Sequence, residues 1–155
     1  MSVHAIILLK ELVKLMTDNE IKNFCNLWSQ ANSAYLMGHL QFPEPLLKEI
    51  IIKKFDNQLV KNKGVSPYDF VGNIELKSTT KKGGVTPFKS TQNKCSRIIY
   101  AEFDDNLVTF YELSQKDVDA INDIVKDSKK KQVSICCGKY KNNAIKTFAI
   151  DLTNY

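Results

Sequence analysis

Histidine and arginine are scarce in this chain of 155 residues, which has two histidines and a single arginine, Arg97. So few imidazoles exclude most histidine-based catalysis and histidine-rich metal sites. Any catalysis must therefore rest mainly on carboxylates, lysines and hydroxyls. The lone arginine also leaves little room for recognition of guanine by arginine, so any reading of bases would depend on lysine, amide, hydroxyl or main-chain groups.

Long hydrophobic runs and paired cysteine motifs are also missing. The longest apolar run near the N-terminus, residues 5–9, is broken by Lys10 and Glu11 and is too short to span a membrane. No small-residue cleavage site follows it, so we expect a cytoplasmic chain. The sequence has no CxxC motif among its four cysteines, which are Cys25, Cys95, Cys136 and Cys137. We expect these to be reduced structural residues rather than metal ligands.

The rest of the composition is that of an ordinary globular protein. Hydrophobic residues make up 43% of the chain and charged residues 25%, which argues against disorder, a collagen-like repeat or a coiled coil. The length suits one domain. A formal net charge of +5, from 22 Lys and Arg against 17 Asp and Glu, is compatible with a polyanionic partner but does not require one.

Two helices are predicted at the start of the chain. Apolar residues recur with helical spacing over residues 3–16. Thr17 followed by Glu20 is the pattern of a capping box and predicts a second helix through about Tyr35. Its expected buried residues are Ile21, Phe24, Leu27 and Trp28.

A third helix is predicted over residues 45–62. Pro45 stands at its start and Gly64 just past its end, which is the usual distribution of these two residues around a helix. Its apolar stripe comprises Leu46, Leu47, Ile50, Ile51 and Phe55.

The apolar period changes after Gly64 to that of strands. Strands are predicted over residues 68–71, 74–79, 97–103, 107–113, 133–137 and 144–152. A loop is predicted over residues 80–93, and Ser114 followed by Asp117 begins a helix through about Ser128. The order of elements predicts an α/β fold with one central mixed sheet flanked by helices, preceded by N-terminal helices.

An acid and a lysine stand two positions apart on the strand predicted over residues 74–79. Because successive side chains of a strand point to opposite faces, Glu75 and Lys77 project together while Leu76 points into the core. The carbonyl of Leu76 stays near the edge of the same site.

A second acid, Asp69, joins this pair only through a particular turn. A two-residue turn at Gly72 and Asn73 would put Asp69 on the wrong face, whereas a three-residue turn over residues 71–73 pairs it with Glu75. Glycine and asparagine tolerate the left-handed backbone that such a bulged turn requires.

These groups suit phosphodiester chemistry. Two carboxylates and a main-chain carbonyl are hard oxygen ligands for Mg²⁺, which polarises a phosphate and lowers the pKa of a bound water. Lys77 is placed to orient or deprotonate that water and to stabilise negative charge in the transition state.

Four residues together resemble the motif of the PD-(D/E)XK nuclease superfamily: Pro67, Asp69, Glu75 and Lys77. Finer features resemble a small type II restriction endonuclease, namely the strand at residues 74–79, the Gly-Val-Thr-Pro-Phe loop at 84–88 and the strand at 98–103.

The resemblance implies a restriction-endonuclease-like core and a Mg²⁺-dependent, sequence-specific endonuclease that cuts double-stranded DNA to leave 5′-phosphates. It implies that Asp69, Glu75 and Lys77 are catalytic and that Asp69, Glu75 and the Leu76 backbone carbonyl hold the metal. It also implies a homodimer and a cognate methyltransferase in the same system. A helix before the first core strand sometimes supplies one more acid in this superfamily, for which Glu49 is the candidate.

Basic residues flank the motif. Lysine supplies sequence-independent affinity for phosphate, and amide side chains hydrogen-bond base edges. The candidate DNA-binding residues are Lys81, Lys82, Lys89, Gln92, Asn93, Lys94, Lys139 and Lys141. Lys129–Lys131 are interpreted instead as a solvated helix end.

We expect one nuclease domain over residues 1–155. Residues 1–42 form its N-terminal helical part, a candidate dimer surface, and residues 43–155 form the catalytic core. One alternative is a homing endonuclease or Holliday-junction resolvase of the same fold, which substrate preference would separate. Others are a non-catalytic DNA-binding module, in which Mg²⁺ would change neither binding nor DNA integrity, and an unrelated α/β protein in which Glu75 and Lys77 face away from any cleft.

Overall fold

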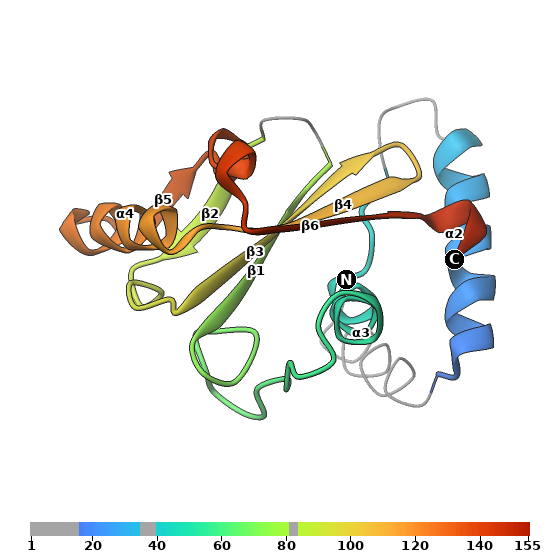
Figure 1. Ribbon diagram of the computed structural model, residues 1–155, viewed down its shortest axis with the longest axis horizontal. Coiled ribbons are helices and arrows are strands. Elements are labelled where there is room, and N and C mark those ends of the chain that lie inside the picture. The colour runs from blue at the N-terminus through green and yellow to red at the C-terminus, as the bar shows by residue number, and fades with distance from the viewer. Residues whose placement is uncertain (1–15, 35–39, 81–83) are drawn as a thin grey trace.

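The centre of the molecule is a mixed sheet of four strands in the order β1–β3–β4–β6 (Figure 1). The computed structural model describes residues 16–34, 40–80 and 84–155. β1 and β3 are parallel, and the other two pairs are antiparallel, which confirms the α/β class and the mixed central sheet. The strands are β1 (Ile74–Thr79), β3 (Arg97–Asp104), β4 (Leu107–Glu112) and β6 (Lys146–Asp151).

A separate antiparallel pair, β2 (Thr86–Lys89) and β5 (Gln132–Ile135), corrects two expectations. The segment expected to be a loop over residues 80–93 contains β2, because buried Thr86 and Phe88 alternate with exposed neighbours. β5 pairs with β2 rather than with β6, so the last two predicted strands, at residues 133–137 and 144–152, belong to two different sheets and not to one.

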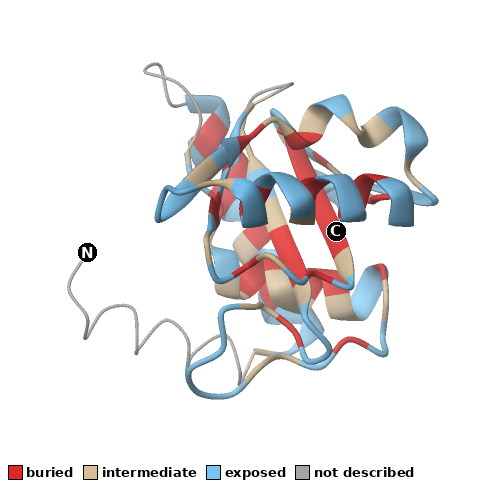
Figure 2. Cartoon of the chain, turned by 90° about the vertical axis from the view of Figure 1, so that its left-hand side faces the viewer, coloured by how far each residue is buried: buried red, intermediate tan, exposed pale blue. Residues whose placement is uncertain are grey.

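Helices and the second sheet cover the two faces of the central sheet. α2 (Asp18–Ala34) and α3 (Glu44–Lys54) pack on one face through a cluster that includes Trp28 and Ile50. α4 (Gln115–Asp127) and the β2–β5 pair pack on the other face, around Phe88 and Tyr100. Figure 2 looks onto this second face, where buried strand segments lie behind exposed outer surfaces.

The predicted capping box begins α2. The Glu20 amide donates to the Thr17 hydroxyl at 3.3 Å, and the Glu20 carboxylate accepts from the Thr17 amide at 2.6 Å. Ile21 and Trp28 are buried as expected, but Leu27 is 67% exposed because it lies off the stripe that faces the sheet. The helix predicted over residues 3–16 falls, apart from its last residue, outside the described residues.

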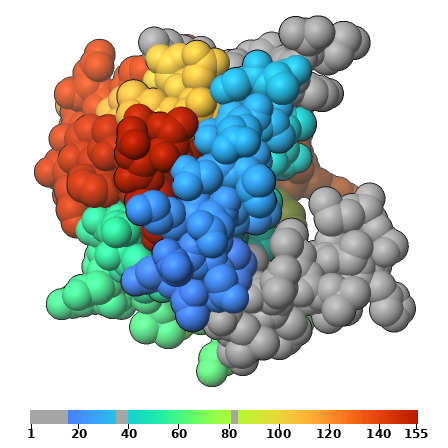
Figure 3. Space-filling view, turned by 90° about the vertical axis from the view of Figure 1, so that its right-hand side faces the viewer, coloured from blue at the N-terminus to red at the C-terminus, as the bar shows by residue number. Residues whose placement is uncertain are grey.

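The two ends of the described chain meet on the outside of the molecule. Figure 3 shows α2 lying beside the C-terminal residues, which end in a short 3-10 turn over Leu152–Asn154 that contacts this helix. The Lys54 ammonium lies 4.9 Å from the centre of the Tyr155 ring, so α3 joins the same contact.

The third helix is shorter than its apolar pattern predicts. Its five predicted core residues are all buried, yet α3 ends at Lys54 rather than near residue 62. The amides of Phe55 and Asp56 both donate to the Ile51 carbonyl at 2.9 Å. The Asp56 carboxylate then accepts from the Gln58 amide at 3.1 Å, which turns the chain away from the helix axis.

None of the described helices is both long and apolar enough to cross a membrane. The structure describes all four cysteines, none of which forms a disulfide, and Cys25, Cys95 and Cys137 are buried. Burial raises the pKa of the Cys25 and Cys95 thiols to about 12, so both stay protonated at neutral pH.

Candidate active site

A three-residue turn leads into β1, as the site requires. Phe70 and Ile74 form an antiparallel bridge, in which the Phe70 amide donates to Ile74 at 3.0 Å and the Ile74 amide to Phe70 at 3.4 Å. Between them, Gly72 and Asn73 have φ angles of 85° and 60°. The pairing puts Asp69 across from Glu75, so of the two turn lengths considered the structure has the three-residue one.

The segment before this turn is not the regular strand expected over residues 68–71, because within it only Phe70 forms bridges, with Lys61 and Ile74. Further along β1, a side chain accepts the hydrogen bond that a neighbouring strand would otherwise accept: the Leu76 amide donates to Asp69 Oδ2 at 2.8 Å. Asn62 fixes the same segment, since its amide nitrogen donates to the Phe70 carbonyl at 2.8 Å.

The bond to Asp69 also defines where the Leu76 carbonyl points. The amide and carbonyl of one residue in an extended strand lie on the same side, and the Leu76 amide faces the outer edge of β1, away from β3. The Leu76 carbonyl therefore faces the edge where Asp69 lies, while its side chain is buried among the residues that pack under α3.

Glu75 lies inside the protein with one oxygen unsatisfied. The residue is 2% exposed, and its Oε1 lies 2.6 Å from Lys77 Nζ and 2.7 Å from Gln92 Nε2. Its Oε2 is buried and has no hydrogen-bond partner among the described residues. Burial first, and then the nearby negative charge of Asp69, raise the pKa of Glu75 to about 7.

Lys77 is fixed from three sides. Besides Glu75, its Nζ meets Gln92 Oε1 at 3.3 Å and stands 4.6 Å from the centre of the Phe88 ring on β2. The β2–β5 pair therefore contributes, through the Phe88 ring, to holding this ammonium beside Glu75.

Gln92 is buried, whereas a residue that contacts DNA bases would be expected to be exposed. It is 6% exposed, and its amide group donates to the Pro67 carbonyl at 2.7 Å and accepts from the Lys89 amide at 2.8 Å. Its side chain thus connects the turn that follows β2, which we call the β2 turn (residues 89–93), to Glu75 and to the segment before Asp69. In this arrangement it positions the site rather than facing a ligand.

The acid that α3 brings to the site is Glu44, not Glu49. The Glu49 carboxylate pairs with Lys61, whereas that of Glu44 shares a lysine with Asp69. Glu44 Oε1 lies 2.8 Å from Lys48 Nζ, which in turn lies 2.5 Å from Asp69 Oδ1. Neither Glu44 nor Lys48 belongs to a local sequence motif. Glu44 stands one position before the helix predicted over residues 45–62, so its spacing of four residues from Lys48 was the available signal.

The donor set fits a hard divalent cation. The unsatisfied Glu75 oxygen, the Asp69 carboxylate and the Leu76 carbonyl are oxygen donors gathered at one end of the turn. No group of three or more His, Cys, Asp or Glu side chains in residues 16–34, 40–80 and 84–155 stands ready to hold a metal. The ammonium of Lys48 contacts Asp69 Oδ1.

The candidate DNA-binding residues fall into three groups. Lys81 and Lys82 lie outside the described residues. Lys89, Lys94 and Lys139 are exposed, and Asn93 lies with Lys94 in a hollow of about 370 Å³ beside α4. Lys141 instead meets the buried Glu102 carboxylate at 2.9 and 3.1 Å, a buried acid–lysine pair that the sequence analysis missed.

The β2–β5 pairing collects further lysines. Lys89 lies opposite Gln132, and the Ser90 amide donates to the Lys131 carbonyl at 2.9 Å. Lys129–Lys131, separated from Lys89 by 40 positions or more in the sequence, are therefore its neighbours. All four lysines are exposed and lack an acidic partner in the part of the chain that the structure describes.

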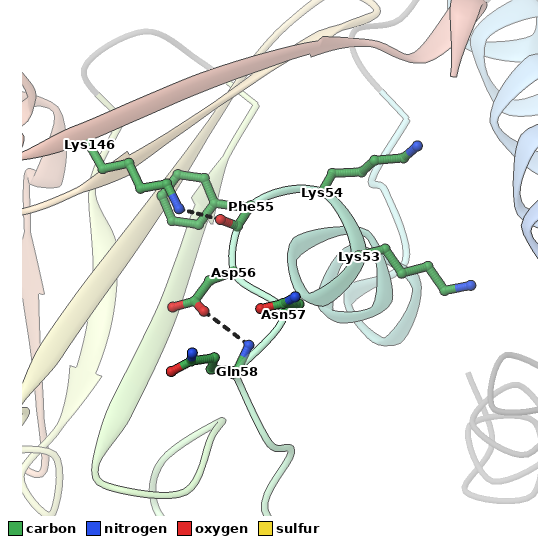
Figure 4. A pocket seen from close by; sticks show the side chains of 7 residues that line it. All are labelled: Lys53, Lys54, Phe55, Asp56, Asn57, Gln58 and Lys146. Carbon is green, nitrogen blue, oxygen red and sulfur yellow. Dashed lines mark hydrogen bonds between the residues drawn. The ribbon is translucent and has the colours of Figure 1, made fainter.

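A second hollow, of about 310 Å³, lies at the other end of α3 (Figure 4). Lys146 Nζ donates to the Phe55 carbonyl and stands 4.2 Å from the centre of the Phe55 ring. Asp56 is bound to Arg97 at 2.8 Å. The one acid of this hollow, Asp56, is thus already paired, so the hollow offers no set of acidic oxygens comparable to that at Asp69 and Glu75.

Comparison of the chain with protein-family models, with curated proteins and with solved structures found no match in any of the three.

Proposed function

We propose that the protein is a Mg²⁺-dependent endonuclease that hydrolyses double-stranded DNA at specific sequences and leaves 5′-phosphates, as a small type II restriction enzyme does. One observation carries the proposal: Asp69, Glu75 and Lys77 converge at one end of a three-residue turn, and a buried Glu75 oxygen there has no partner among the described residues. A buried acceptor without a partner is costly, and such groups concentrate at functional sites.

The residues divide the chemistry between them. Asp69, Glu75 and the Leu76 carbonyl would hold the Mg²⁺. When bound, that ion supplies a polarised scissile phosphate and a more acidic water. Lys77, fixed by Gln92 and the Phe88 ring, orients this water and stabilises the extra negative charge of the transition state.

Exposed lysines support a DNA partner. Lys89 and Lys129–Lys131 gather at one end of the β2–β5 pair, and Gln92 connects that pair to Glu75. Phosphates passing the site would meet these ammonium groups, which bind DNA without regard to sequence. Base recognition would then fall to other groups of the β2 turn, Asn93 among them.

A chain with one such site cuts both strands most simply as a homodimer, whose two-fold axis would match a near-palindromic DNA site. A methyltransferase of the same specificity would accompany a restriction enzyme and protect the host DNA. Both partners are part of the proposal.

A non-catalytic DNA-binding module is the second candidate. The Lys48–Asp69 ion pair favours it, because a lysine that remained on Asp69 would compete with any metal.

Cleavage of a long DNA of mixed sequence in Mg²⁺ tests the proposal. We compare the wild type with Lys77→Ala, with EDTA, and with Lys116→Ala as a control on the exposed side of α4. We expect discrete fragments whose rate of formation falls about 10²–10⁴-fold in Lys77→Ala and is unchanged in Lys116→Ala. Fragments that ligate without prior phosphorylation would show 5′-phosphate ends.

Two results would contradict the proposal. Cleavage that survives Lys77→Ala would place the active site elsewhere. DNA that a folded wild-type protein binds but leaves intact, with or without Mg²⁺, would favour the binding module.

A further inference from the structure

Lys48 takes the position beside Asp69 that a cation would be expected to take. Its Nζ lies 2.5 Å from Asp69 Oδ1 and 2.8 Å from Glu44 Oε1, and the Lys48 side chain is only 19% exposed. The other Asp69 oxygen already accepts the Leu76 amide. Lys48 thus contacts the Asp69 oxygen that does not accept the Leu76 amide.

We propose that Lys48 is a built-in counter-ion that holds Asp69 and Glu44 in the metal-free protein and that a divalent cation displaces on binding. This inference rests on the proposed function, because it takes Asp69 as a metal ligand. Lys48, which lies outside the sequence motif, would then be a positioning residue that holds Asp69.

Charge explains why the lysine is there. Asp69 stands close enough to the buried Glu75 for the two negative charges to repel each other. Glu44 is exposed and shares the Lys48 ammonium with Asp69. Although burial opposes the charge of Lys48, Asp69 and Glu44 outweigh burial and raise its pKa, so the side chain stays an ammonium. Without a metal, Lys48 is the group that neutralises Asp69.

Charge also explains why the lysine must move. A divalent cation on Asp69 would stand within a few ångströms of the Lys48 ammonium, and like charges at that separation repel strongly at low dielectric. Lysine has a flexible four-carbon stem with a compact head group. Its exit toward solvent leaves Asp69 and Glu44 for the metal.

Metal affinity measured without DNA tests this exchange. Free Mn²⁺ is counted by electron paramagnetic resonance in titrations of the wild type, Lys48→Met and Lys53→Met. Methionine keeps the length and the helix propensity of lysine but not its charge. Lys53 is the matched control, because it lies on α3 and pairs with Asp18, away from Asp69.

We expect Lys48→Met to bind Mn²⁺ about tenfold or more tightly than the wild type, within the usual range of coupling between two ligands, and Lys53→Met to bind like the wild type. Equal or weaker binding by a folded Lys48→Met protein would overturn the inference. No Mn²⁺ binding by either protein would overturn it as well.

A measurement on the wild type covers the case in which Lys48→Met does not fold. In protein labelled with ¹³C-lysine, the Lys48 ε-methylene signals should move toward those of a solvated lysine as Ca²⁺ saturates the protein. Signals that stay in place at saturation would show that the lysine does not leave. A Lys48 exchange without DNA cleavage would refute the nuclease alone, whereas cleavage with unchanged Mn²⁺ affinity in Lys48→Met would refute the exchange alone.

Discussion

Two clusters of acidic and basic side chains lie at opposite ends of α3, and they differ in how fully their acids are satisfied. At the C-terminal end, the Arg97 guanidinium binds both Glu112 oxygens, at 2.7 and 3.0 Å, and Asp56 at 2.8 Å. The second Asp56 oxygen accepts the Gln58 amide. Near the N-terminal end, one oxygen of Glu75 is buried with no partner among the described residues.

The difference separates a structural cluster from a candidate site. Arginine, the only one in the chain, joins α3 to β3 and β4 with a rigid, doubly bonded fork. The cluster at Asp69 and Glu75 uses lysines, which are flexible and more easily exchanged. An arrangement that leaves a buried acceptor open makes sense where a ligand supplies the missing contact.

The largest stability effect should come from the satisfied cluster. Arg97→Met leaves Glu112 and Asp56 as partly buried, uncompensated charges, so we expect the free energy of unfolding to fall by about 3 kcal/mol. Urea denaturation measures it, with exposed Lys63→Met as the control. Mn²⁺ affinity should not change while the variant is folded, and a change in it would mean that the two clusters are coupled.

The cluster at Asp69 and Glu75 should make the free energy of unfolding depend on pH. The pKa of Glu75 rises from its ordinary value of 4.5 to about 7 in the folded protein, so the folded state disfavours its ionised form. This contribution to stability is complete below pH 4.5 and is lost as the pH rises toward and through 7, by up to about 3 kcal/mol.

Glu75→Gln removes the titrating group, and we expect the free energy of unfolding to fall less between pH 5 and pH 8 than in the wild type. At pH 8 the variant should be the more stable protein, although it should not cleave DNA. Urea denaturation across this pH range provides the measurement. Equal slopes in the two proteins would show that Glu75 is not the group that titrates.

The smallest effect on the fold is expected from the exposed lysines. Replacing Lys129–Lys131 with alanine removes charges that have no acidic partner among the described residues, so stability should change by no more than about 0.5 kcal/mol. The slope of log Kd for DNA against log salt should decrease by about one to three, since each lost phosphate contact contributes about 0.9. Replacing exposed Lys22, Lys63 and Lys116 with alanine is the control, since it removes the same three charges, and an equal effect there would show that net charge alone matters.

The sequence predicted the local features of the molecule well. The capping box of α2 and the β1 strand with Glu75 and Lys77 on one face depend on residues within a few positions of one another. The sequence narrows the turn before β1 to two lengths, of which the structure has the three-residue one. Local patterns are sufficient there because strand alternation and turn geometry operate over short distances.

Features that depend on distant contacts could not be predicted in the same way. Lys48 and Glu44 reach Asp69 across more than 20 positions, and Gln92 reaches Glu75 across 17. The early end of α3 reflects a competing side-chain bond of Asp56 rather than a loss of apolar pattern. Only the folded chain shows which of the two glutamates of α3 shares a lysine with Asp69.

The turn over residues 71–73 gives the site an unusual kind of sensitivity. A Cβ atom built on Gly72 meets nothing within 4 Å, so its backbone angle and the number of residues in the turn constrain it, not lack of space. Deletion of one residue would shift the pairing by one position and send Asp69 to the opposite face of the strand. A one-residue deletion in this turn, and not only the substitution of a charged residue, would therefore leave the fold but remove the chemistry proposed for Asp69.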